Sequence, residues 1–235
     1  GVMNTDNISI LGETFDYGPY AFMETYDPNY ICNHTDSHGR YSFSNQPSIA
    51  EWNCYALASA LIDLFSETEL RDILNKFNDY FYDSLIEKYR KKLGFKSALD
   101  SDYDLLLGLF EIMETERLDY TNTFRDLSMI ITSSDDLKLS GNFSSWLASY
   151  KARLGKDENN IEQSIFVMHE NNPKYILRNY LAQSAIEDAE EGKSEKIDQL
   201  IKVLSNPFDD LGKSMEKYCK PAPKEHQNQQ LSCSS

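Results

Sequence analysis

The sequence predicts a mainly α-helical protein that carries one short β-hairpin at its N-terminal end. Apolar residues recur every three or four positions over most of residues 48–204, as expected for helices with one buried face. Glycine and proline residues break this pattern at Gly141, Gly155, Pro173, Gly192 and Pro207. The stretch Ile8-Ser9-Ile10-Leu11 is apolar but too short for a helix, so we interpret it as a strand.

The N-terminal 46 residues are predicted to contain the hairpin and a long loop. Residues 1–18 are interpreted as two short strands joined through Gly12. Residues 19–46 are rich in Tyr, Asn, Asp, Gly and Pro, which is typical of an ordered loop, and the interleaved aromatic residues favour a loop that packs onto the fold. Pro47 suits the first turn of the helix that follows.

The rest of the chain is predicted to be helical up to a polar tail. The helix over 48–65 is apolar nearly all round, which is typical of a buried core helix. Ser66 and Glu69 have the spacing of a capping box and open a second helix that continues to about Leu93. Further helices are expected near 102–117, 121–133, 142–154, 160–170, 174–191 and 194–204. We therefore divide the chain into 1–46, a helical region 47–208, and a tail 209–235 with little structure of its own up to 231.

Composition excludes two classes of function. The net charge of −15 argues against nucleic-acid binding, which needs clustered Lys and Arg residues. No apolar run approaches the length that crosses a bilayer, so the sequence predicts no membrane partner.

The candidate site lies beside the predicted hairpin. Asp6 and Asn7 stand at one end of the apolar stretch, and Asp16 follows at the other, within Asp16-Tyr17-Gly18-Pro19. Kinase-like enzymes hold nucleotide phosphates through Mg²⁺ with an Asn and an Asp, while a nearby Asp accepts the proton of the attacking hydroxyl. The alternative is a solvated turn at Asp6 and Asn7, followed by an Asx turn at Asp16.

The amino-acid sequence of several segments resembles the selenoprotein O family, also called YdiU. The resemblance is carried by Gly1-Val2-Met3-Asn4-Thr5-Asp6-Asn7-Ile8-Ser9-Ile10, Asp16-Tyr17-Gly18-Pro19, Tyr26-Asp27-Pro28-Asn29-Tyr30-Ile31-Cys32-Asn33-His34, Gly39-Arg40-Tyr41-Ser42-Phe43, Leu177-Arg178-Asn179-Tyr180-Leu181-Ala182-Gln183 and the terminal Ser232-Cys233-Ser234-Ser235. It spans the chain end to end, with a looser match in the middle third.

The resemblance implies a fold, an activity and residue roles. The fold would be the C-terminal lobe of a protein-kinase-like (pseudokinase) fold, and the activity would be transfer of AMP from ATP to Ser, Thr or Tyr hydroxyls of proteins. Asp6 would be the proton acceptor, Asn7 and Asp16 would bind Mg²⁺ or Mn²⁺, and Asp16 would also contact the nucleotide. Residues 19–46 would be the activation segment, which Arg178 and Asn179 would brace from outside the site. The compartment would be the cytoplasm of a bacterium or the mitochondrion of a eukaryote.

One feature departs from ordinary protein kinases. These place the catalytic Asp five residues before the metal-binding Asn, whereas Val2 stands at that position here and Asp6 is adjacent to Asn7. The chain also begins inside a catalytic loop, without a phosphate-binding glycine loop, so we interpret it as the C-terminal half of a longer protein and expect no turnover from it alone. Phosphoryl transfer by an atypical kinase, UMP transfer from UTP and a non-catalytic nucleotide-binding scaffold remain open.

Cysteines suggest a second, redox feature. Four cysteines permit three pairings, among which the sequence does not choose. Family members with a selenocysteine carry it three residues from the C-terminus, so the resemblance places Cys233 at that redox position and suggests a disulfide with Cys32. The alternative is two reduced thiols. His34 and His38 flank Asp36, but the set lacks a fourth ligand and predicts hydrogen bonds in a loop rather than a zinc site.

Overall fold

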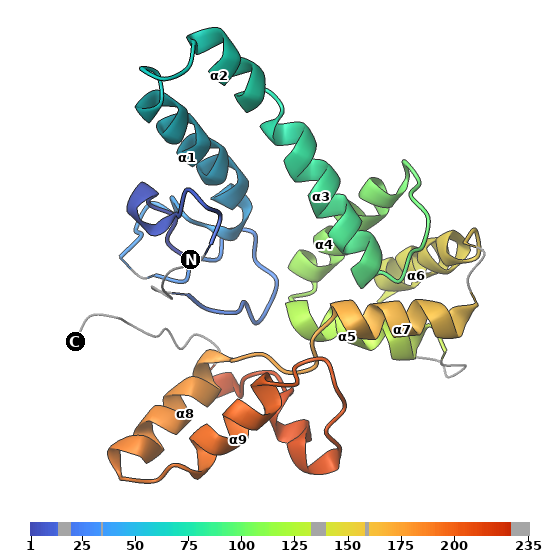
Figure 1. Cartoon of the computed structure of the whole chain (residues 1–235). Coiled ribbons are helices and arrows are strands. Elements are labelled where there is room, and N and C mark those ends of the chain that lie inside the picture. The colour runs from blue at the N-terminus through green and yellow to red at the C-terminus, as the bar shows by residue number, and fades with distance from the viewer. Residues whose placement is uncertain (14–19, 34, 133–139, 158–159, 227–235) are drawn as a thin grey trace. The chain divides into compact units, whose positions relative to one another are not determined.

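The computed structural model describes residues 1–13, 20–33, 35–132, 140–157 and 160–226 (Figure 1). The chain divides into two compact units. Among these residues, the first unit contains 1–13, 20–21, 27–33 and 35–85, and the second contains 22–26, 86–132, 140–157 and 160–226. The mainly helical class is confirmed within these ranges, whereas the kinase-like arrangement stays a prediction.

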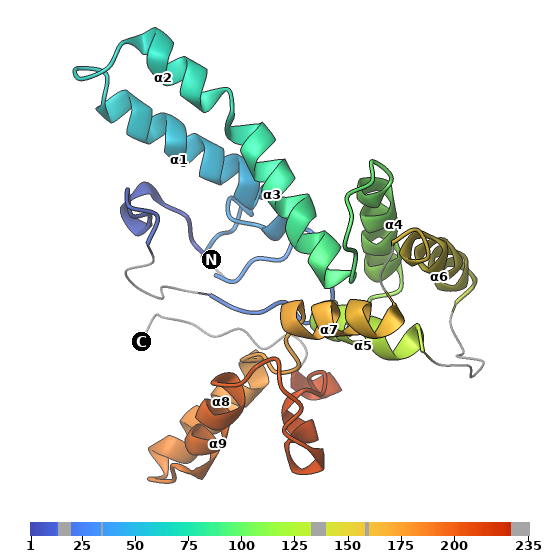
Figure 2. The same ribbon diagram turned by 45° about the vertical axis from the view of Figure 1, so that its right-hand side comes forward.

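The first unit contains α1 (Gln46–Ala60), α2 (Glu67–Leu74) and the first half of α3 (Phe77–Lys92), and Figure 2 shows α1 lying beside α2. Pro47 occupies the first turn of α1, as predicted. The capping box is confirmed, because the Ser66 side chain accepts from the Glu69 N–H while the Glu69 carboxylate accepts from the Ser66 N–H. The single helix predicted after Ser66 is divided in two at Asn75 and Lys76.

The prediction that the helix beginning near residue 48 is buried all round is wrong for these 235 residues. Only Ile49 and Asn53 of α1 are buried, while Trp52 is 47% exposed and Tyr55 is 42% exposed. The helix also ends at Ala60 rather than residue 65, and turns follow it. Apolar composition fixed the helix, but the extent of its burial depends on what packs against it.

The strand predicted over Ile8–Leu11 is also wrong. This stretch forms bends and a turn in which the Gly12 N–H donates to the Ser9 backbone oxygen at 3.0 Å. Ile10 and Leu11 are 78% and 77% exposed, so no buried face selects extended backbone here. Within the described residues the only β-type pairing is an isolated antiparallel bridge between Thr25 and Asp119.

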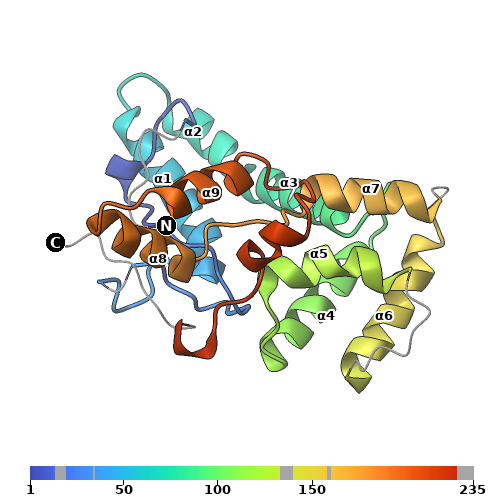
Figure 3. The same ribbon diagram turned by 90° about the horizontal axis from the view of Figure 1, so that it is seen from below.

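The second unit contains two packed pairs of helices, in which α4 (Asp102–Thr115) packs against α6 (Gly141–Leu154) and α5 (Tyr120–Ile130) packs against α7 (Ile161–Asn171) (Figures 1 and 3). Aromatic rings fill the space beside α4 and α5. The Tyr89 ring lies edge-on to Phe110 with centroids 5.3 Å apart, and Tyr26 stacks on Phe110 at 4.9 Å.

A buried ionic cluster joins α4 to α6 and to the loop after α3. Asp102 is fully buried and pairs with both Arg153 and Arg90, and the Arg90 Nε lies 2.7 Å from the Asp102 carboxylate. Arg153 also pairs with Asp157 at 3.1 Å, and Asp157 accepts from the Lys96 N–H at 2.8 Å. Burial by itself would raise the pKa of Asp102, but hydrogen bonds from Arg153, the Leu99 N–H and Arg90 hold it below its ordinary value.

The last part of the second unit is built on α8 (Asn179–Glu190), α9 (Glu195–Leu204) and the 3₁₀ helix η3 (Lys213–Tyr218). Tyr175, Ala185, Leu200, Val203 and Tyr218 form its core. The helix predicted from 174 begins only at Asn179, and the Lys174 and Tyr175 N–H groups before it donate to the Pro207 carbonyl at 2.7 and 3.1 Å.

The prediction of a tail with little structure is wrong for residues 213–222. Tyr218 is 4% exposed and Ala222 is 6% exposed, so this polar segment contributes apolar side chains to the core. No helix in the described ranges combines the length and the apolar character needed to cross a membrane.

Candidate functional site

Asp6 and Asn7 lie together in one turn of 3₁₀ helix, η1 (Thr5–Asn7). Both side chains are exposed. The Asn7 N–H donates to the Asn4 carbonyl at 3.0 Å, and its side-chain Nδ2 donates to the Val2 carbonyl at 3.4 Å. Because the Asn7 side-chain nitrogen bonds the backbone, its Oδ1 atom is left as an oxygen that could bind a cation.

Two side chains from later in the first unit hold this turn in place. Asn53 on α1 is buried, and its Nδ2 donates to the Met3 carbonyl at 2.9 Å and to the Ile49 carbonyl at 2.8 Å. The Tyr41 hydroxyl donates to the Asn4 Oδ1 atom. The segment before Asp6 is thus fixed by contacts that the sequence analysis did not identify.

The third candidate, Asp16, lies outside the described residues, so the structure does not test whether it joins Asp6 and Asn7. The two described side chains offer a carboxylate and an amide oxygen, which are the hard ligands that Mg²⁺ and Mn²⁺ prefer. They fit a divalent cation as part of a larger set. Within the described ranges, no group of three His, Cys, Asp or Glu side chains is placed to hold a metal.

The redox and histidine candidates are tested only in part. Cys32 is half-buried, and Cys233 lies outside the described residues, so their pairing stays a prediction. Both oxygens of Asp36 accept from the backbone, from the Arg40 N–H and the Tyr41 N–H at 2.8 Å each. Asp36 therefore builds a turn. The hydrogen bonds expected of His34 and His38 stay a prediction, and His34 lies outside the described residues.

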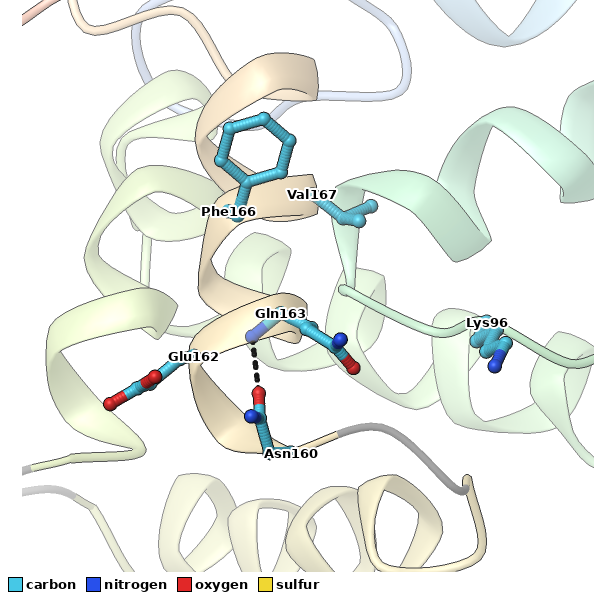
Figure 4. Close-up of a pocket in the computed structure, with 6 residues that line it drawn as sticks. All are labelled: Lys96, Asn160, Glu162, Gln163, Phe166 and Val167. Carbon is cyan, nitrogen blue, oxygen red and sulfur yellow. Dashed lines mark hydrogen bonds between the residues drawn. The ribbon is translucent and has the colours of Figure 1, made fainter.

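A hollow of about 600 Å³ lies along α7, and none of the site residues proposed from the sequence lines it. Its lining consists of Lys96, Asn160, Glu162, Gln163, Phe166 and Val167 (Figure 4). Asn160 caps α7 by accepting from the Gln163 N–H at 2.8 Å, the dashed line in Figure 4. The polar groups that line the hollow thus include a structural helix cap. Its six lining residues contain no nucleophile paired with a base.

A second buried polar cluster surrounds Arg178, which is fully buried just before the start of α8. Its guanidinium binds the Glu24 carboxylate, the Asp119 carboxylate at 2.7 Å and the Asn122 side-chain oxygen at 3.2 Å. We call these four residues the Arg178 anchor. All of them belong to the second unit.

The Arg178 anchor holds a five-residue segment, Phe22–Tyr26, which we call the strap. The strap belongs to the second unit, although the residues on both sides of it in the sequence belong to the first. Its backbone pairs with the start of α5, because the Tyr26 N–H donates to the Leu118 carbonyl at 2.9 Å and the Tyr120 N–H donates to the Glu24 carbonyl at 2.8 Å. Arg178 thus braces the segment 19–46 at Glu24, as its place in the sequence match predicts.

The charges and hydrogen bonds of the Arg178 anchor do not fully compensate for the burial of its polar groups. Burial raises the pKa of Glu24, an effect only partly offset by the Arg178 charge and by the Ala222 N–H. Within the described residues, the buried Glu24 Oε1 and Arg178 Nε atoms have no hydrogen-bond partner. Sequence reasoning left Arg178 outside the site and missed Glu24, Asp119 and Asn122, since nothing in their spacing signals a cluster.

Comparison with known proteins identifies the family. The family model described as "Protein adenylyltransferase SelO" matches residues 1–205, most of the chain. The chain belongs to the SelO family.

Curated members of the SelO family match the chain over its whole length. The "Protein nucleotidyltransferase YdiU" of Pseudomonas fluorescens strain Pf0-1 is 43% identical over 242 residues, which cover 100% of this chain and 50% of that protein. The protein of the same name from Stutzerimonas stutzeri is also 43% identical, with 49% of its length covered, and that of Cupriavidus metallidurans is 37% identical, with 47% covered. The chain therefore spans about half the length of these SelO relatives.

Proposed function

We propose that the full-length protein is a metal-dependent protein adenylyltransferase that transfers AMP from ATP to Ser, Thr or Tyr hydroxyls of proteins. The observation that carries the proposal is the match of residues 1–205 to the adenylyltransferase family, with Asp6 and Asn7 exposed as consecutive residues of one turn.

Each site residue has a role in the proposed reaction. The acceptor hydroxyl oxygen attacks the α-phosphorus of ATP, the bond from that phosphorus to the oxygen bridging to the β-phosphate breaks, and pyrophosphate leaves. Asp6 accepts the proton of the hydroxyl. Asn7 and Asp16 would hold Mg²⁺ or Mn²⁺, and Asp16 would also contact the nucleotide phosphates. When bound, the cation would neutralise charge at the attacked phosphate.

Labelled nucleotides test the proposal on the full-length protein. Transfer of label from α-labelled ATP, without transfer from γ-labelled ATP, is the expected result, and intact-protein mass should increase by AMP. Asp16→Ala should abolish the transfer, and Asp6→Asn should lower the rate while nucleotide still binds. Label from γ-labelled ATP would instead identify a protein kinase, and full-length protein that binds ATP but labels nothing would identify a nucleotide-binding scaffold.

UTP is a second candidate donor, because the relatives are named nucleotidyltransferases without a stated base. Comparing α-labelled UTP with α-labelled ATP at equal concentration decides between UMP and AMP transfer. We expect no transfer from the 235-residue chain alone, and self-labelling of this chain would contradict that expectation.

A disulfide between Cys32 and Cys233 is proposed as a redox control of the same site. It would close a loop of about 200 residues, for which the chain-entropy model gives roughly 5 kcal/mol of stabilisation. Non-reducing gels of the wild type and Cys233→Ser should differ in mobility after oxidation. Identical mobility would rule the bond out.

A further inference from the structure

We propose that residues 219–222, which we call the C-terminal segment, hold the strap in place, so that displacement of this segment frees the strap from α5. Both segments belong to the second unit, and the contact between them joins Glu24 to Ala222, 198 positions apart in the sequence. Such a coupling is a property of the fold, whether or not the protein transfers nucleotides.

Two residues of the Arg178 anchor bind the C-terminal segment directly. Glu24 on the strap accepts from Arg178 and, through its Oε2 atom, from the Ala222 N–H at 3.3 Å. Asn122 on α5 accepts from Arg178 at 3.2 Å, while its Nδ2 atom donates to the Cys219 carbonyl at 3.2 Å. Each of these two side chains thus joins the buried arginine to the C-terminal segment, so the anchor and the segment form one hydrogen-bonded network.

The sequence of the C-terminal segment provides one specific backbone donor for the strap. Ala222 lies between Pro221 and Pro223, and proline has no N–H group. The Ala222 N–H is therefore the only amide hydrogen of these three residues, and it donates to the Glu24 carboxylate. The flanking prolines also restrict the backbone of the unfolded chain, so holding this stretch in one conformation costs less entropy than holding a flexible one.

The C-terminal segment is itself held by contacts that do not involve the strap. The Tyr180 hydroxyl, in the first turn of α8, donates to the Lys220 carbonyl at 3.1 Å. Tyr218, just before the segment, belongs to the α8–α9 core, and the Ala222 side chain at its end is buried. The segment therefore connects the strap to the α8–α9 core, whereas the backbone bonds of the strap connect it to the start of α5.

Displacement of the C-terminal segment should loosen the strap because a buried carboxylate then loses a hydrogen-bond donor. The Glu24 Oε1 atom is already buried without a partner among the described residues. Loss of the Ala222 N–H would remove a donor from the other oxygen, Oε2. A buried acceptor that lacks donors is costly, so the strap should separate from α5 more often, and local opening of this kind is measured by hydrogen exchange.

Hydrogen exchange of the full-length protein, followed by mass spectrometry, tests the coupling. The reporters are the Tyr26 N–H, which donates to the Leu118 carbonyl, and the Tyr120 N–H, which donates to the Glu24 carbonyl. Ala222→Pro removes the N–H donor, and the position suits proline because a residue before a proline already favours the extended backbone that proline adopts. Exchange at both reporters should become roughly 10- to 100-fold faster, the effect of losing a hydrogen bond to a charged group.

Ala222→Ser is the matched control, because it keeps the N–H donor and should leave exchange at both reporters unchanged. Tyr180→Phe tests the coupling from outside the strap, since it removes the hydroxyl that holds the Lys220 carbonyl. It should speed exchange at the reporters by roughly 2- to 10-fold, the effect of losing one ordinary hydrogen bond. Tyr180→Phe decides the test if Ala222→Pro does not fold.

Acceleration confined to the strap and the start of α5 would support the coupling. Unchanged exchange at the reporters in folded Ala222→Pro would overturn it. Equal acceleration by Ala222→Ser would refute the role of the N–H group. Acceleration by the same factor in peptides from α4 and α6 would also overturn the coupling, because it would show a loss of stability throughout the second unit rather than release of the strap.

Discussion

Gly94 offers a direct test of the packing at the end of α3. Its φ is +73°, and the Gly94 and Phe95 N–H groups donate to the Lys91 carbonyl at 3.1 Å and the Arg90 carbonyl at 2.8 Å, the pattern of a Schellman motif. A Cβ atom added here would lie 2.9 Å from both the Met168 Cγ and the Ser164 carbonyl oxygen of α7.

The cost of Gly94→Ala follows from these two facts. Left-handed backbone costs an L-residue about 1–2 kcal/mol, and a steric overlap in a packed interior adds about 1–3 kcal/mol. The free energy of unfolding should therefore fall by about 2–5 kcal/mol. Met168 can move, whereas the Ser164 carbonyl is held in a helix.

Gly192 provides a matched control. It follows α8 with a φ of +80°, and the Gly192 and Lys193 N–H groups make the same two hydrogen bonds, both at 2.9 Å, but no atom lies within 4 Å of an added Cβ. Gly192→Ala should cost only the backbone term of about 1–2 kcal/mol. Urea unfolding followed by circular dichroism measures the free energy of unfolding of both variants, which are compared at the same dependence on urea concentration. Equal destabilisation by the two substitutions would refute the predicted contact with α7.

Three further predictions concern buried groups. Burial lowers the pKa of Lys92 from 10.5 to about 8, so between these pH values the unfolded chain binds more protons than the folded chain, and the free energy of unfolding rises with pH. Lys92→Met should lose this rise, which urea unfolding from pH 7 to 9.5 measures. Parallel pH profiles of the wild type and the variant would contradict the prediction. Arg153→Met removes one of the two arginines that pair with the buried Asp102 carboxylate and should lower the free energy of unfolding by about 3–5 kcal/mol. Lys193→Met breaks an exposed ion pair and should lower it by at most about 1 kcal/mol. An equal decrease of Tm in the two variants would argue against the buried cluster. Tyr218→Ala removes a 4% exposed ring from the α8–α9 core and should lower the free energy of unfolding by about 3–5 kcal/mol, as Phe→Ala substitutions in cores do, which a lower Tm would show. An unchanged Tm would support the interpretation of residues 209–231 as a tail with little structure.

Helices were predictable where local signals were strong. The capping box at Ser66 and the proline in the first turn of α1 both depend on residues within one turn, and both are found as expected. The split between α2 and α3 was not predicted, because neither Asn75 nor Lys76 is a strong helix breaker. The strand over Ile8–Leu11 was not found, because an apolar run gives extended backbone only when a partner strand and a buried face are present.

The candidate site divides in the same way. Adjacency in the sequence places Asp6 and Asn7 in one turn, so the sequence alone predicts that they lie in the same turn. The contacts that fix this turn, from Tyr41 and Asn53, come from distant positions and carry no local signature. The Arg178 anchor is a stronger case, because Glu24 and Arg178 are 154 positions apart.

By itself, the sequence determined the helical class, the local caps and the chemistry available at Asp6, Asn7 and Asp16, because each of these depends on neighbouring residues or on residue type. Only the tertiary structure decided that α1 remains partly exposed, that residues 213–222 enter a core, and that the strap is held by a buried arginine. These features depend on contacts between positions far apart in the chain, and hydrophobic periodicity does not specify which distant surface a side chain will meet.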